Sequence, residues 1–97
     1  KFTCAIKEPN QIEMIECAAE KYNESDHQLN ILYQNKMKML KMNKANQLRI
    51  SQRKWIAEKE ANCNHYTEEE SGSNGRLESF ECSLQMTKER IRFLQKY

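Results

Sequence analysis

The C-terminal stretch has the most regular hydrophobic spacing in the chain. Its apolar or near-apolar positions step by three and four residues, at Leu77, Phe80, Leu84, Thr87, Ile91 and Leu94. This spacing predicts a helix that presents one face to a core. A coiled-coil seam has the same spacing, but so short a stretch favours packing across a helical hairpin. Asn74 is a candidate N-cap, and Thr87 is a position at which the helix could break and restart.

Residues 48–63 form a second stretch of helical character, which holds the only tryptophan and ends in a cysteine. The stretch contains no Gly or Pro and is rich in residues of good helix propensity. The residues that share one face at helical spacing are Leu48, Gln52, Trp55 and Asn62, with Ile56 beside the tryptophan. Because a tryptophan is large enough to organise a small core, we expect Trp55 to be a core anchor.

The first 40 residues predict one or two further helices. Asn10 followed by Glu13 has the spacing of an N-cap, with Pro9 just outside the helix. The apolar positions that follow are Ile12, Met14, Ile15, Ala18 and Tyr22, and then Leu29, Leu32, Tyr33, Met37 and Leu40. Ser25 with Gln28 repeats the capping pattern, so a second helix begins there or the first continues through it. We expect Leu29 and Tyr33 to join Trp55 as core anchors.

Two breaks between helices are expected. Asn43–Asn46 is the best candidate for a helix-to-helix turn, after which the helix Leu48–Asn62 would return antiparallel. Residues 64–75 lose the helical periodicity and include a low-complexity run, Thr-Glu-Glu-Glu-Ser-Gly-Ser-Asn-Gly, so we expect an irregular loop there. Thr67 and Glu70 have capping-box spacing, but the absence of a following apolar run argues against a helix start.

Composition agrees with a helical fold. The 97 residues correspond to one domain, spanning 1–97, and two Gly and one Pro disfavour a turn-rich β fold. The mean hydropathy of −0.98 leaves few apolar residues for the core. The patterns therefore predict an all-α fold, a small antiparallel hairpin or bundle of three to five helices. No apolar run approaches the ~20 residues that a membrane span needs, so no membrane span is expected.

The four cysteines suit two disulfides and hence an oxidising compartment. Of the three possible connectivities we expect the local one, Cys4 with Cys17 and Cys63 with Cys82, because each pair closes one predicted loop. A zinc site is disfavoured, since neither pair has Cys-x-x-Cys spacing. Export is inferred from the cysteines alone, with a signal peptide removed or lying outside this sequence.

The net charge of +2 conceals a strong segregation along the chain. Residues 36–59 carry eight basic side chains against Glu58 alone, whereas residues 60–81 carry six acidic side chains against Arg76 alone. One interpretation is that neighbouring helices pair opposite charges and leave the rest to solvent. The other is a basic face and an acidic loop directed at different partners.

No catalytic, metal or cofactor site is indicated. Cys63 and His65 with Cys82 would supply three soft ligands, but a disulfide beside a loop histidine explains them more simply. Two disulfides leave no thiolate nucleophile, and the glutamates of the acidic run lack the burial that a general acid needs. Nucleic acid is not expected as a partner, since the basic stretch lacks interleaved aromatic residues.

Several motifs converge on one family. They are Gln11-x-Glu13-Met14-x-x-Cys17-Ala18, Asp26-x-x-Leu29-Asn30-x-x-Tyr33, Leu48-Arg-x-x-Gln52-Arg-x-Trp55-Ile56, Cys63, Gly75, Cys82, and Met86-Thr87-x-x-Arg90 before Leu94. Their order and spacing resemble the LprI-type lysozyme-inhibitor family of small secreted or periplasmic bacterial proteins, from Cys4 to Leu94. The resemblance implies an all-helical fold with two disulfides, export and no enzymatic activity. The chain departs from the family at Glu58-Lys59-Glu60, where an aromatic-Arg-Asp triplet is usual.

The expected function is therefore that of an exported, non-enzymatic inhibitor that blocks a lysozyme-like, cell-wall-degrading enzyme. An immunity protein against a periplasmic peptidoglycan-targeting toxin is an alternative, as is an envelope adaptor that binds anionic polymers through its basic face. Lysozymes are typically basic proteins, so an acidic surface would speed association. The candidate contact residues are accordingly Glu68, Glu69 and Glu70 in the expected loop and Arg76 directly after it.

Overall fold

The described part of the protein is a bundle of three long helices. A computed structural model describes residues 10–64 and 68–97, the side chains of Gln11 and of residues 68–74 excepted. In these residues α1 spans Gln11–Met39, α2 spans Met42–Cys63 and α3 spans Glu68–Lys96, and there is no strand. The all-helical prediction is confirmed for this part of the chain. None of its helices is long and apolar enough to cross a membrane.

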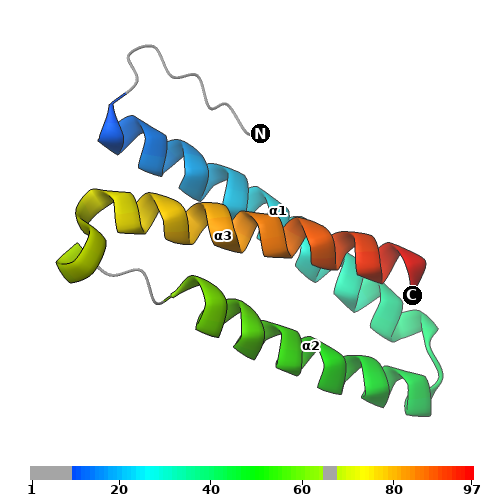
Figure 1. Ribbon diagram of the computed structural model, residues 1–97. Helices are drawn as coiled ribbons and strands as arrows, with labels where there is room; N and C mark the ends of the chain where they lie inside the picture. The colour runs from blue at the N-terminus through cyan, green and yellow to red at the C-terminus, as the bar shows by residue number, and fades with distance from the viewer. Residues whose placement is uncertain (1–9, 65–67) are drawn as a thin grey trace.

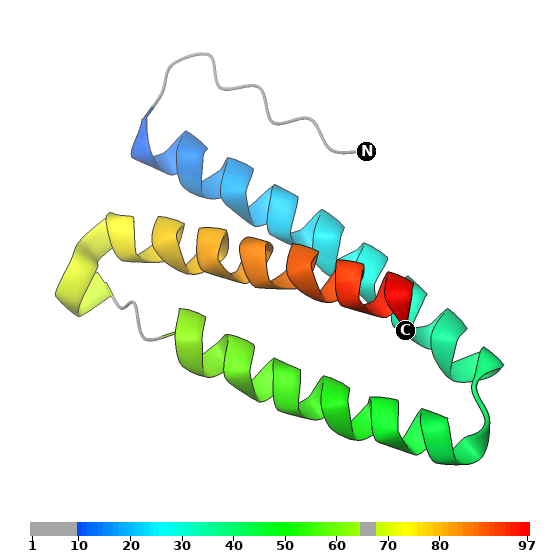
Figure 2. The same cartoon turned by 45° about the vertical axis from the view of Figure 1, so that its right-hand side comes forward.

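The chain runs up, down and up again. α1 and α3 therefore lie parallel to each other, and α2 returns antiparallel to both (Figures 1 and 2). α3 is the central helix, since it packs along α1 and also against α2, whereas α1 and α2 touch least. The molecule is elongated, with principal dimensions of 49 × 30 × 15 Å.

The core lies where the three helices meet. It is built from Leu29 of α1, Leu48 and Trp55 of α2, and Leu94 of α3, with Tyr33 packed against this cluster. Leu48 and Leu94 have no exposed surface, and Trp55 is 8% exposed. On the face of α2 expected from the sequence, Gln52 is buried but Asn62 is exposed. Cys63, one residue further on, occupies the buried position.

The first helix begins as the sequence predicts. Asn10 is its N-cap, and the Asn10 side chain accepts a hydrogen bond from the Glu13 backbone N–H at 2.9 Å. Of the two alternatives at Ser25, the structure shows the continuous one, because Ser25 is buried inside α1.

The expected turn at Asn43–Asn46 is wrong. The chain reverses at Leu40 and Lys41, and α2 already begins at Met42. Both asparagines satisfy their side chains within the helix: Asn43 accepts from the Lys44 backbone N–H, and Asn46 accepts from Arg49 at 2.6 Å. Polar side chains that usually indicate a cap are here used within the first two turns of the helix.

The expected irregular loop at residues 64–75 is also wrong over most of its length. α3 begins at Glu68, so Asn74 is not its N-cap, and the low-complexity run is helical from Glu68 onward. Glutamates in a first turn are favoured by the positive end of the helix dipole, which offsets the poor helix propensity of the Ser and Gly that follow. Figures 1 and 2 show this first part of α3 bending away from the rest of the helix. α3 then runs through Thr87 without a break.

One predicted disulfide is confirmed. Cys63 at the end of α2 is bonded to Cys82 in α3, which closes a loop of 19 residues. A loop of this size removes on the order of 3 kcal/mol of entropy from the unfolded chain. Cys4 lies outside the described residues, so its pairing with Cys17 stays a prediction. Cys17 itself is not a free thiol.

Thr87 offers a direct test of the core. Its side chain is fully buried, and its hydroxyl has no hydrogen-bond partner among the described residues. Leaving such a group unpaired costs about 1–3 kcal/mol. We therefore expect Thr87→Val, which keeps the shape and removes the hydroxyl, to raise the melting temperature by about 4–8 °C per kcal/mol gained. Thr87→Ser is the control and should lower it; a Thr87→Val protein that melts below the parent would show that the hydroxyl is bonded.

Candidate functional site

The residues proposed from sequence to meet a partner do not lie on a loop. Glu68, Glu69 and Glu70 occupy the first turn of α3, and Arg76 is exposed one to two turns further along the same helix. The side chains of the three glutamates lie outside the described residues. Because α1 and α3 lie parallel, the beginning of α1 lies at the same end of the molecule as the beginning of α3 (Figure 1).

The beginning of α1 is acidic as well. Its first four turns carry Glu13, Glu16, Glu20 and Glu24 against a single lysine, Lys21. The first half of α3 carries Glu78 and Glu81 in addition to the three glutamates of its first turn. Most of these α1 and α3 carboxylates with described side chains are exposed. We call this surface, formed by residues 13–24 and 68–81, the acidic end.

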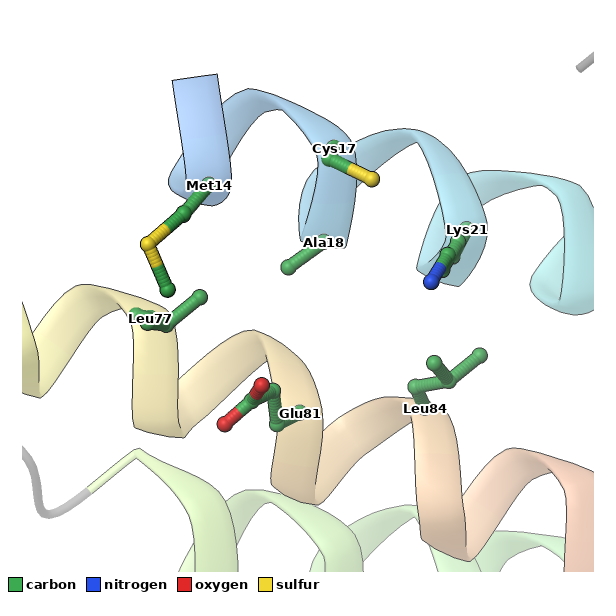
Figure 3. A pocket seen from close by; sticks show the side chains of 7 residues that line it. All are labelled: Met14, Cys17, Ala18, Lys21, Leu77, Glu81 and Leu84. Atoms are coloured by element: carbon green, nitrogen blue, oxygen red, sulfur yellow. The ribbon is translucent and has the colours of Figure 1, made fainter. Parts of the chain in front are cut away.

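A small pocket opens between α1 and α3 at the acidic end. It has a volume of about 150 Å³, and mostly apolar side chains line it: Met14, Cys17, Ala18, Leu77 and Leu84, with Lys21 and Glu81. Figure 3 shows Met14 and Leu77 reaching toward each other across the gap, with Leu84 directed at α1 from the opposite helix. This volume is below the 300–1,000 Å³ of ordinary ligand pockets but admits one benzene-sized group. It suits a single apolar side chain of a protein partner.

A second groove continues from this pocket along the same two helices. It is lined by Lys21, Glu24, Ser25, Gln28, Leu84 and Lys88, so it shares Lys21 and Leu84 with the first. The lining is more polar here than in the first pocket. The α1–α3 surface therefore combines one apolar depression with a polar rim, which is the composition of a protein-binding surface.

The contact between α2 and α3 is organised around Arg90. Its Nε donates to Oε1 of Gln52 and its Nη2 donates to Oγ of Ser51, both at 2.8 Å. The guanidinium stacks on Phe93 at 4.2 Å from the ring centre and lies 5.8 Å from that of Trp55. Burial lowers the pKa of Arg90, against the opposing effect of Glu58 and Tyr97, but an arginine stays charged at any physiological pH. Through these contacts Arg90 holds α2 against α3.

Lys59 fastens α2 to α1. Its ammonium donates to the Tyr22 hydroxyl at 2.6 Å and lies 5.3 Å from the centre of the Trp55 ring. Lys59 is the middle residue of the triplet Glu58-Lys59-Glu60. Sequence reasoning assigned this residue no role, because only the fold brings position 59 beside position 22.

The described residues show no catalytic constellation. They contain no cluster of three metal-binding side chains and no free cysteine, and His27 is exposed on α1. His65 lies outside them.

Comparison with known proteins identifies a family. The sequence profile of the lysozyme inhibitor LprI family matches residues 4–94, which is nearly the whole chain. The chain belongs to the LprI family. Neither the curated proteins nor the solved structures contain a significant match.

The structure gives a role to several of the motif positions on which the resemblance to the LprI family rests. Leu29, Leu48, Trp55 and Leu94 form the core, Cys63 and Cys82 the disulfide, and Gln52 with Arg90 the α2–α3 contact. Sequence reasoning did not identify the pocket residues Met14, Leu77 and Leu84 as neighbours. Their spacing marks the core-facing side of each helix, but only a parallel register of α1 and α3 places them together.

The fastening role of Arg90 can be measured. Arg90→Lys keeps the charge but loses the fork that reaches both Gln52 and Ser51 and the stacking on Phe93. We expect it to lower the free energy of unfolding by about 1–3 kcal/mol in a denaturant titration. Arg92→Lys, at an exposed position two residues away, is the matched control and should change it by less than about 0.5 kcal/mol. Equal stabilities of the two variants would contradict the assignment.

Proposed function

We propose that this protein is an exported, non-enzymatic inhibitor that binds a lysozyme-like, cell-wall-degrading enzyme through its acidic end. The observation that carries the proposal is the match to the lysozyme inhibitor LprI family over residues 4–94. The disulfide between Cys63 and Cys82 supports the export, since such bonds persist in oxidising compartments.

The acidic end supports the choice of surface. Lysozymes are typically basic, so carboxylates of α1 and α3 would attract such an enzyme and raise the rate of association. The apolar pocket of about 150 Å³ at the same end would then receive one side chain of the enzyme. The carboxylates would raise the association rate, and a side chain held in the pocket would lower the dissociation rate.

Rigidity of the surface supports it too. Both helices that form the acidic end are long and pack along each other, and the disulfide attaches the end of α2 beside them. A preformed surface loses little conformational entropy on binding, and this favours affinity without a large contact area.

The test is inhibition of a purified lysozyme acting on a peptidoglycan suspension, together with binding kinetics at low and high salt. We expect the parent chain to slow the loss of turbidity. Replacing Glu68, Glu69 and Glu70 by Gln should reduce the association rate several-fold at low salt and leave the dissociation rate nearly unchanged, because dispersed charges act on encounter.

The matched control removes three charges from the other end of the molecule, with Lys38, Lys41 and Lys44 replaced by Gln. All three lysines are exposed, and their replacement should leave the kinetics of lysozyme binding as they are or slightly faster. Absence of inhibition by the parent would overturn the proposed function. Inhibition that is insensitive to the glutamates but lost on replacing the three lysines would place the contact at the opposite end.

A further inference from the structure

The end of the molecule opposite the acidic end is strongly basic. The α1–α2 turn and the C-terminus lie together there (Figures 1 and 2). Residues 27–57 contain no Asp or Glu, and the end also receives Arg92 and Lys96 from α3. The basic residues closest to the turn are Lys36, Lys38, Lys41 and Lys44. We call the segment 36–44 the basic tip.

Two methionines stand out from the basic tip into solvent. Met39 ends α1 and Met42 begins α2, and they are 79% and 81% exposed. These are the highest exposures among the large hydrophobic residues that the structure describes. Leu40, between them, instead packs against the core. The tip therefore presents two flexible apolar side chains surrounded by lysines.

Helix stability does not explain these charges. A helix is stabilised by acidic residues in its first turn and basic residues in its last, but α2 has neither. It begins at an N-cap lysine that makes no side-chain capping bond, and Lys44 lies in its first turn, at the positive end of its own dipole. The negative C-terminal ends of α1 and α3 nearby offset this in part, but each is equivalent to only about half a charge.

We propose that the basic tip docks on the surface of an anionic lipid bilayer, with Met39 and Met42 entering the boundary between headgroups and acyl chains. The lysines then contact lipid phosphates. Interfacial protein segments of this kind combine exposed apolar side chains with Lys and Arg, and neither part suffices for stable attachment. This inference is independent of the proposed function.

Each of the other candidate partners would match either the lysines or the methionines of the basic tip, but not both. A soluble polyanion would neutralise the lysines but leave both methionines in water. A second copy of the tip would cover the methionines but would bring two sets of lysines together. A basic enzyme would be repelled. A bilayer with anionic headgroups is the partner that takes both the charges and the apolar side chains.

Docking by the tip has a geometric consequence. Because the basic tip and the acidic end lie at opposite ends of a molecule 49 Å long, the acidic end would face away from the bilayer. The two surfaces would then be usable at the same time.

The test is flotation of the chain with lipid vesicles, some of neutral phosphatidylcholine and some containing a third of phosphatidylglycerol. The parent should float with the anionic vesicles alone, and less so at high salt. Replacing Met39 and Met42 by Ser should weaken vesicle binding at least tenfold. Each Lys→Gln change at the tip should weaken it about fivefold. Ile12→Ser, which removes a 71% exposed side chain near the acidic end, is the matched control and should bind as the parent does.

Two further measurements separate the alternatives. Lys44→Glu should reduce vesicle binding without lowering the melting temperature, because it places an acid in the first turn of α2. Binding of the methionine variant to vesicles at parental strength would overturn the proposal in favour of simple polyanion binding. A concentration-dependent dimer that the same variant abolishes, in sedimentation without lipid, would overturn it in favour of self-association.

Discussion

The position of α2 on α3 is the constraint on which the rest of the structure depends. α1 and α3 pack along each other, whereas α2 makes a smaller contact with α3 and touches α1 least. Its register is set at one end by the Cys63–Cys82 bond, in the middle by Arg90 on Gln52 and Ser51, and at the other end by a reversal of only two residues. If α2 slid by one turn, Trp55 would leave the core and its charges would face different neighbours.

The sequence predicted the features that depend on local chemistry or regular spacing. The Asn10 cap, the periodic face of α3 and the Cys63–Cys82 pair belong to this class. The predictions from sequence were wrong where polar residues have two possible uses. Asn43 and Asn46 indicated a turn but form hydrogen bonds within α2. The Ser and Gly residues after Glu70 indicated a loop but continue α3. The pocket between Met14 and Leu77 and the contact of Lys59 with Tyr22 depend on a tertiary register that no local pattern contains.

Charge illustrates how a linear pattern becomes a spatial one. Along the chain the sign alternates, and each reversal of direction brings segments of like sign to the same end of the bundle. Two of the helices are stabilised by this arrangement, since α1 and α3 begin with acids, and basic residues lie in their last turns. α2 carries the opposite pattern. A cost in helix stability that the fold tolerates is typical of residues retained for binding.

The single tryptophan gives this bundle an optical reporter. Trp55 is buried where α2 meets α3, within 6 Å of the cationic groups of both Lys59 and Arg90. Its fluorescence emission is therefore sensitive to the contact between α2 and α3, and this contact can be followed without an added label. A shift to longer wavelength would signal that α2 has detached, even while α1 and α3 remain helical and circular dichroism changes little.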